Sequence, residues 1–175
     1  MDSRVVGEWF DLILTNEFPI LRKELKMKKT LYIDMDNVLV DFQTGIDSCD
    51  EQTLIDFENR LDEVPHIFSK MKPLDGAIES FNLLSQYFDT YILSTAPWEN
   101  ATAWSDKLAW VKMHLGEKAH KRLILSHNKH LNKGDFLIDD RLANGADRFE
   151  GELIRFGSME FPDWKSVVDY LIKKT

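Results

Sequence analysis

The 175-residue sequence predicts an α/β fold: a three-layer, Rossmann-like parallel sheet with a small helical cap inserted after the first strand. Short apolar runs alternate with stretches whose apolar residues recur at helical spacing, a pattern typical of parallel strands joined by right-handed helical crossovers. After the first strand, about thirty residues of polar and helical pattern precede Pro73, which is too long for a simple connection. This segment therefore predicts an inserted cap.

Three parts of the chain follow from these patterns. The core domain comprises residues 27–41 and 73–175, and residues 42–72 form the helical cap, whose first helix Asp41 is placed to cap. Residues 1–26 form an N-terminal extension. It is predicted to be helical because its apolar residues recur at helical spacing: Val5, Val6, Trp9, Phe10, Ile13 and Leu14.

Each element of the core has its own signal. The first strand is the buried run 31–33, and further apolar runs predict strands at residues 90–94, 123–126, 135–138 and 152–156. Three helices are expected between and after these strands, the first capped by Asp75 and the second ended by Gly116. Their apolar stripes are, in order, Ile78, Phe81, Leu84 and Phe88; Trp104, Leu108, Val111 and Leu115; and Trp164, Val167, Val168, Leu171 and Ile172.

The composition excludes several classes of function. A content of 43% apolar and 11% aromatic residues is enough for a proper core. The net charge of −8 argues against a nucleic-acid partner or an anionic membrane surface, both of which require a basic face. The single cysteine, Cys49, excludes an internal disulfide and a cysteine-built zinc site. With no apolar run long enough to span a bilayer, the chain is expected to be a soluble cytoplasmic protein.

Polar groups follow three of the predicted strands. Asp34 and Asp36 come directly after the first, Ser94 and Thr95 close the second, and Asp139 and Asp140 close the fourth, with Lys129 in the loop before it. Because the carboxyl ends of parallel strands meet at one edge of a sheet, these groups are expected to converge. Neighbouring carboxylates repel one another, and Mg²⁺, which takes oxygen ligands, is the natural counter-charge.

This set of groups suits phosphoryl transfer through an aspartyl-phosphate. One carboxylate would attack phosphorus, and a second would protonate the leaving oxygen and then activate water. A hydroxyl and a lysine would hold the charge on the transferring oxygens. The alternative is a set of solvated acidic turns without a metal.

In these motifs the chain resembles the haloacid dehalogenase superfamily phosphatases. The first motif matches residues 34–39, and the resemblance implies Asp34 as nucleophile and Asp36 as general acid/base that also offers its backbone carbonyl to the metal. The second motif matches Thr95, with Ser94 as the alternative, and the third matches Lys129, with Lys133 as the alternative. In the fourth motif, Asp140 is implied as the metal ligand beside Asp34 and Asp36, with Asp139 supporting it.

Within that superfamily, the chain is similar to the 5'(3')-deoxyribonucleotidases over roughly residues 28–173. The similarity lies in the residues around the motifs: Val-Leu-Val-Asp-Phe at 38–42, Thr-Ala-Pro at 95–97, Leu-Ile-Asp-Asp-Arg at 137–141, Phe-Glu-Gly at 149–151 and Phe-Pro-Asp-Trp at 161–164. There are departures. His127 stands where animal members carry an arginine used on the phosphate, Ala96 stands where a serine is common, and the cap is short.

The resemblance implies Mg²⁺ as cofactor and a small phosphomonoester, a deoxyribonucleotide, as substrate. Phe42 and Trp98 flank the motifs and could sandwich a base or sugar, and Ala96 and His127 complete the expected substrate contacts. Packing in the core or cap is the alternative for the two aromatic residues. A phosphatase of another metabolite, such as a sugar phosphate, and a non-catalytic binding protein on the same fold are the rival functions, and a homodimer is possible.

Overall fold

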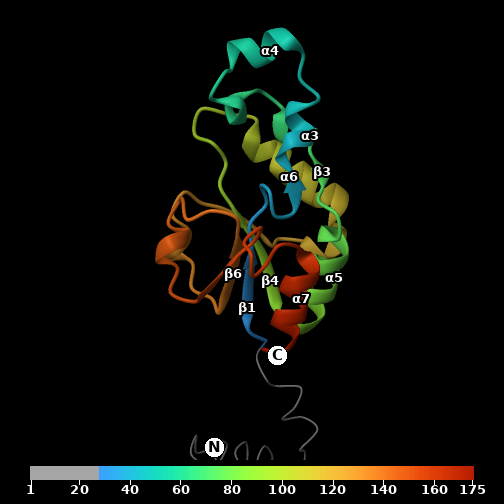
Figure 1. Cartoon of the computed structure of the whole chain (residues 1–175), viewed down its shortest axis with the longest axis vertical. Helices are drawn as coiled ribbons and strands as arrows, with labels where there is room; N and C mark the ends of the chain where they lie inside the picture. Colours follow the sequence, from blue (N-terminus) through green and yellow to red (C-terminus); the bar gives the residue numbers. More distant parts are fainter. Residues whose placement is uncertain (1–27) are drawn as a thin grey trace, which may run out of the picture.

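The computed structural model describes residues 28–175, so the helix predicted within residues 1–26 lies outside the described residues. Figure 1 shows a parallel sheet in the middle of the molecule with helices packed along one side. The sheet has five strands in the order β5-β4-β1-β6-β7, and all neighbouring pairs are parallel. They are β1 (Thr30–Ile33), β4 (Asp89–Ser94), β5 (Leu123–Leu125), β6 (Phe136–Asp139) and β7 (Glu152–Arg155). The predicted α/β class with a parallel sheet is confirmed.

The strand order determines where a ligand can bind. From β1 the chain moves outward through β4 to β5, and it then returns to the other side of β1 for β6 and β7. The connections after β1 and β6 therefore diverge. A crevice opens at such a switch point, beyond the carboxyl ends of the strands. The two acidic motifs of the sequence follow these two adjacent strands.

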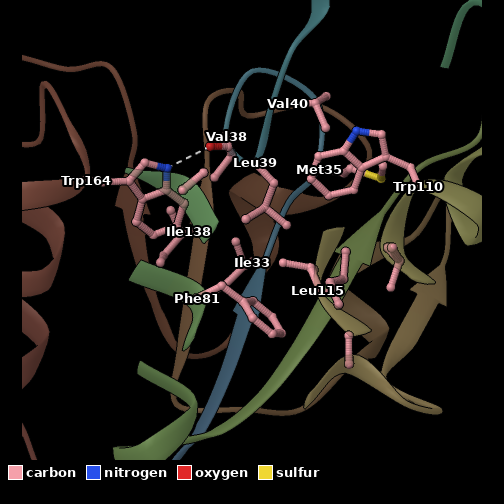
Figure 2. Packing of buried hydrophobic residues seen from close by; sticks show 14 of the residues in the cluster. Ile33, Met35, Val38, Leu39, Val40, Phe81, Trp110, Leu115, Ile138 and Trp164 are labelled. Carbon is pink, nitrogen blue, oxygen red and sulfur yellow. Dashed lines mark hydrogen bonds between the residues drawn. The ribbon is translucent and has the colours of Figure 1, made fainter. Parts of the chain in front are cut away.

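One face of the sheet carries the main apolar cluster and the α-helices of the core. These are α5 (Ala77–Tyr87), α6 (Ala103–His114) and α7 (Trp164–Ile172), with the 3₁₀ helix η3 (Gly116–Ala119) after α6. Figure 2 shows this cluster, including the apolar residues Val38 and Leu39 that follow the first acidic motif. Trp164 Nε1 donates to the Val38 carbonyl oxygen at 2.9 Å. This hydrogen bond from α7 therefore helps to fix the position of the loop that carries Asp34 and Asp36.

The opposite face of the sheet is covered more thinly. Its apolar cluster comprises Tyr32, Leu93, Leu137, Ala146 and Phe149. The covering segment contains the 3₁₀ helices η4 (Lys129–Leu131) and η5 (Ala146–Arg148), which contact each other. The second outer layer of the predicted three-layer fold is therefore 3₁₀ helix and loop. This segment brings Lys129 to the sheet.

The segment predicted to form the cap, residues 42–72, lies beyond the carboxyl ends of the strands, with α4 farthest from the sheet (Figure 1). It comprises α3 (Phe42–Ile46), α4 (Glu51–Asp56), η1 (Leu61–Glu63) and η2 (Ile67–Ser69). As predicted, Asp41 caps α3, accepting a hydrogen bond from the Gln43 backbone N–H. The antiparallel pair of β2 (Val40–Asp41) and β3 (Lys72–Pro73), which joins the cap to the core, was not predicted from the sequence.

Two predicted details of the helices are wrong. The N-cap of α5 is Gly76 in a left-handed conformation, with φ of 72°, and not Asp75. In α6, Trp104 and Leu108 of the predicted stripe are 47% and 43% exposed. Val111 and Leu115 of the stripe are buried as predicted, and the other buried positions of the helix are Ala103, Asp106, Lys107 and Trp110. The helix is rotated because its two buried charges have partners: Lys107 meets Asp36, and Asp106 lies 3.3 Å from His66 Nδ1 of the cap.

Candidate active site

The register of the sheet places the acidic residues of the first and fourth motifs side by side. Ile33 pairs with Ile138, and the backbone N–H of the following residue, Asp34, donates to the Ile138 carbonyl oxygen at 2.8 Å. Side chains alternate between the two faces along parallel strands. Ile33 and Ile138 belong to the main cluster, so Asp34 and Asp139, one residue further on, lie toward the opposite face. That is the face from which Lys129 approaches.

Lys129 is buried between the two carboxylates. Its Nζ lies 3.0 Å from Asp34 Oδ1 and 2.5 Å from Asp139 Oδ2, and the residue is only 3% exposed. Burial opposes its charge, but Asp34 and Asp139 outweigh that effect and raise the pKa of Lys129. Lysine is a compact point charge that suits such a site. The alternative, Lys133, is exposed at the surface.

The loop around Gly145 holds Lys129 in place. The Lys129 backbone N–H donates to the Asn144 carbonyl oxygen at 2.8 Å. Gly145 has φ of 81°, and a Cβ there would lie 2.3 Å from Nδ1 of His130. Only glycine allows both this backbone conformation and this close approach. The turn before η5 therefore fixes the position of the lysine.

Asp34, Asp139 and Asp140 form an acidic cluster in which one carboxylate oxygen from each lies within 4.8 Å of the others. Within residues 28–175, Asp34 Oδ1 and Asp140 Oδ1 are buried, and each faces a cation without a well-formed hydrogen bond: Lys129 Nζ lies 3.0 Å from Asp34 Oδ1 and Arg141 Nε lies 3.7 Å from Asp140 Oδ1. Both oxygens of Asp139 are engaged, by Lys129 Nζ and by the Arg141 backbone N–H at 2.9 Å. Buried carboxylate oxygens with incomplete hydrogen bonding are costly, and a hard divalent cation would complete their coordination. The donor set thus fits a metal ion held through Asp34 and Asp140.

The pKa values of this cluster reflect the same crowding. Burial and the neighbouring Asp34 raise the pKa of Asp139 to about 6, although Lys129 opposes the rise. Burial and Asp34 also raise the pKa of Asp140. Lys129 pairs with Asp34 and Asp139, and Arg141 Nε lies 3.7 Å from Asp140 Oδ1, so two cations face three carboxylates in this cluster.

Asp36 does not contact Lys129. It pairs with a different lysine, Lys107 of α6. Lys107 Nζ donates to both carboxylate oxygens of Asp36 at 2.7 Å. Burial raises the pKa of Asp36, Lys107 lowers it, and Asp34 raises it, with a net upward shift. Lys107 was not found from the sequence. Its signal is a charged residue at helical spacing from Ala103 and Trp110, on what proves to be the buried face of α6.

The end of β4 separates the two hydroxyl candidates. Ser94 is fully buried and its Oγ lies 3.0 Å from Lys107 Nζ. Thr95 is half-buried, faces the same cleft as Asp36, and donates from Oγ1 to the Ser126 carbonyl oxygen at 2.8 Å. The expected substrate contact through Ala96 is not supported, because this residue is fully buried in the main apolar cluster. Its methyl group packs in the core, whereas Thr95 before it faces the cleft.

A cleft of about 500 Å³ extends from Asp36 and Thr95 to the cap. Three of the four expected substrate contacts, Phe42, Trp98 and His127, line this cleft together with Asp36 and Thr95. Trp98 is 80% exposed, and its ring stands edge-on to the His127 ring with 5.9 Å between centroids. Phe42 packs against Phe68 of η2 with centroids 6.0 Å apart. An apolar groove of about 700 Å³ between α6 and β5 is larger but holds none of the acidic motifs.

Two further residues of this region were missed by sequence reasoning. Asn37, with φ of 55°, donates to Asp140 Oδ2 and accepts from the Phe42 backbone N–H, both at 3.4 Å, and so links the acidic cluster to the cap. Asn100 is buried and donates to the carbonyl oxygens of Asp62 and Val64 at 2.8 and 2.9 Å. Amide side chains at loop positions carry no pattern that would have identified these contacts.

With this geometry in place, the comparisons with known proteins define the class. A family model described as "5' nucleotidase, deoxy (Pyrimidine), cytosolic type C protein" matches residues 43–162. The fold and the acidic motifs are those of a haloacid dehalogenase-type phosphatase, a phosphoric monoester hydrolase. Within that class, the chain belongs to the deoxy 5'-nucleotidase family of cytosolic type C.

The relatives agree with this assignment. A protein of Vibrio phage KVP40, provisionally named a 5'(3')-deoxyribonucleotidase, is 58% identical over 152 residues, which cover 87% of this chain and 89% of that protein. The human "5'(3')-deoxyribonucleotidase, cytosolic type" is 25% identical, with coverage of 78% and 77%. The Bacillus subtilis 5'(3')-deoxyribonucleotidase is 26% identical, with coverage of 74% and 86%. In the described part of the chain, no helix is long and apolar enough to cross a membrane.

Proposed function

We propose that this protein hydrolyses the phosphate ester of deoxyribonucleoside monophosphates through a phosphorylated Asp34. The observation that carries the proposal is the buried Asp34–Lys129 pair at the switch point of the sheet, two residues before Asp36, which lines a cleft together with aromatic side chains. The names of the relatives support a nucleotide as the substrate.

The reaction divides into two balanced halves. The Asp34 carboxylate attacks phosphorus while the bond to the leaving oxygen breaks, and that oxygen takes its electron pair and the proton carried by Asp36. Water then attacks the phosphorus held by Asp34, Asp36 accepts the water proton, and Asp34 leaves as a carboxylate. Lys129 and Thr95 hold the charge of the transferring oxygens, and His127 is placed to add a contact from the wall of the cleft.

We propose that Asp34, Asp140 and the backbone carbonyl of Asp36 would hold Mg²⁺, with Asp139 supporting the site through Lys129. When bound, this cation supplies the positive charge that lets a carboxylate approach a phosphate dianion. Asp140 is favoured over Asp139 as a ligand because Asp140 keeps a buried oxygen with no hydrogen-bond partner in the described chain.

The Mg²⁺ requirement leads to a prediction on pH. The pKa of Asp139 is raised to about 6 in the folded protein, compared with about 3.9 in the unfolded chain. Between about pH 4 and pH 6 the folded state therefore binds more protons than the unfolded state does. The unfolding free energy of the metal-free protein therefore falls as pH rises through this window. Because metal binding needs ionised carboxylates, the rise in Tm on adding Mg²⁺ should be large at pH 8 and small at pH 5.

Thermal unfolding with and without Mg²⁺ at the two pH values measures this linkage. The variant Asp140→Asn should weaken the response at pH 8, whereas Asp147→Asn, in the exposed η5 turn, should leave it unchanged. An equal response at both pH values, or a normal response in Asp140→Asn, would contradict the proposed metal site.

The cleft predicts which residue recognises the nucleotide. A base stacked on an aromatic ring contributes roughly 1–3 kcal/mol by alanine substitution in single-stranded nucleic-acid binders. The exposed ring of Trp98 is free to stack, whereas Phe42 also supports Phe68. Trp98→Ala should therefore lower kcat/KM for a deoxynucleoside monophosphate by about 5- to 150-fold. Its activity on p-nitrophenyl phosphate should change little, and equal losses on both substrates would mean that Trp98 contacts no base.

A substrate panel tests the proposed function itself. Purified protein with Mg²⁺ is assayed for phosphate release from deoxyribonucleoside and ribonucleoside 5'- and 3'-monophosphates and from sugar phosphates. We expect deoxyribonucleotides to give the highest kcat/KM. A preference for sugar phosphates would replace the substrate but keep the chemistry, and no release from any ester would favour the non-catalytic binding protein. The cytoplasmic location and the homodimer stay predictions.

A further inference from the structure

Lys107 is the feature of the site that the proposed reaction does not yet use. It lies on α6, in the middle of the core, and is 0% exposed. An unpaired buried ammonium is very costly, so such a lysine is retained only with well-placed partners. Among the described residues, its Nζ contacts both oxygens of Asp36, Ser94 Oγ, and the face of the Phe68 ring at 4.4 Å from the centroid.

These contacts come from three parts of the fold. Asp36 belongs to the loop after β1, Ser94 closes β4, and Phe68 lies in η2 of the cap. The ammonium donates at 2.7 Å to each carboxylate oxygen of Asp36, so rotation of that carboxylate would break at least one hydrogen bond. The Ser94 hydroxyl and the Phe68 ring hold the ammonium in turn. The orientation of the Asp36 carboxylate therefore depends on the packing of η2 of the cap against Lys107.

The cap rests on the same helix through other contacts. Trp110 Nε1 donates to the Met71 carbonyl oxygen at 2.9 Å, and the His66 backbone N–H donates to Thr102 Oγ1 at 2.8 Å. These bonds can hold the cap on α6 when Lys107 is changed. A substitution at Lys107 should therefore act on Asp36 more than on the fold.

We propose that Lys107 is a positioning residue that holds the carboxyl group of Asp36 toward the leaving oxygen and, later, toward the attacking water. The proposal rests on the function proposed above, because it concerns the acid/base role of Asp36. Asp36 lines the cleft and can reach a substrate, whereas Lys107 has no exposed surface and acts only through Asp36. Replacing Lys107 should therefore slow hydrolysis most for the esters whose leaving group needs a proton from Asp36.

Leaving groups of different basicity provide the test. The alkoxide of a nucleotide leaves only with a proton, whereas p-nitrophenolate leaves unaided, and general acid–base catalysis contributes typically 10²–10⁴-fold. In Lys107→Met, which keeps the length and the apolar stem, kcat/KM for a deoxynucleoside monophosphate should fall by about 100-fold or more. The first-turnover release of p-nitrophenol should stay within about tenfold of wild type.

The second half-reaction adds an independent signature. Water attack still needs Asp36 as base, so Lys107→Met should release p-nitrophenol in a burst equal to the enzyme concentration, followed by slow turnover. Lys112→Met, an exposed lysine of the same helix, is the matched control and should behave as wild type. Ser94→Ala removes one anchor of the ammonium without changing any charge, so it should shift both readouts in the same direction by a smaller factor.

The outcomes separate the two proposals. Equal losses on both esters without a burst, in Lys107→Met or, if that variant does not fold, in Ser94→Ala, would overturn the positioning role. If Asp34→Asn keeps wild-type turnover, the proposed function fails instead. A wild type that needs Asp34, together with a Lys107→Met variant of wild-type kinetics, would overturn the role of Lys107 alone.

Discussion

Replacing Asp34 by asparagine is expected to abolish turnover while the fold is kept. The change removes the attacking oxygen and one ligand of the proposed metal site but preserves the size of the side chain. Uncatalysed hydrolysis of phosphate monoesters is among the slowest reactions known, and loss of an enzymatic nucleophile can cost about 10⁶-fold in kcat. We therefore expect deoxynucleotide hydrolysis to fall by about 10⁴- to 10⁶-fold, the upper figure being the cost of removing the nucleophile of another enzyme.

The same variant should not be less stable than wild type in the absence of metal. Asp34 and Asp139 share a single buried lysine, and Asp140 lies in the same acidic cluster, so removing one negative charge relieves repulsion within it. Urea unfolding in EDTA should therefore give an equal or higher midpoint. Asp34→Ala excludes recovery of activity by deamidation, and Asp147→Asn is the surface control. Activity near wild type in either Asp34 variant would remove Asp34 as the nucleophile.

Replacing Lys129 by methionine is expected to be the most destabilising of these changes. The ammonium is buried against Asp34 and Asp139, and removing one partner of a buried ion pair typically costs 3–5 kcal/mol. We expect a loss of about 3 kcal/mol or more in the unfolding free energy at pH 8. Because burial already raises the pKa of Asp139 to about 6, the loss should shrink toward pH 5, where that carboxylate can bind a proton.

Lys133→Met is the matched control, since Lys133 lies in the same loop but is exposed. Its effect should stay within about 0.5 kcal/mol, as for most surface changes, and its activity should be normal. Mg²⁺ should restore part of the stability of Lys129→Met, because a cation in the cluster offsets the missing charge. If Lys133→Met loses activity while Lys129→Met keeps it, the third motif has been assigned to the wrong lysine.

The sequence predicted the parts of this protein that depend on local pattern. The strands, the helices α5 and α7 and the capping role of Asp41 could be placed because each buries a continuous apolar face or carries a recognisable cap. The convergence of Asp34 and Asp139 could also be predicted, since parallel strands in register bring their carboxyl ends to one edge.

The remaining features depend on partners that are distant in sequence. Lys107 was missed because an isolated lysine on a helix is normally exposed, and its burial is explained by partners distant in sequence, above all Asp36, 71 positions away. The same pair explains why the exposed Trp104 and Leu108 were mistaken for the buried face of α6. The pairing of β2 with β3 involves two residues on each strand, too few to produce an alternating pattern.

The central claim is that Asp34 carries the phosphoryl group during turnover. Enzyme mixed with a deoxynucleoside monophosphate and Mg²⁺ is quenched in acid within one turnover, and the peptide containing Asp34 is analysed by mass spectrometry. We expect one phosphoryl group on Asp34 that is gone when the quench follows complete consumption of the substrate, and that is absent in Asp34→Asn. Full turnover with no phosphorylated Asp34 at any quench time, or a phosphoryl group on another residue, would contradict the account.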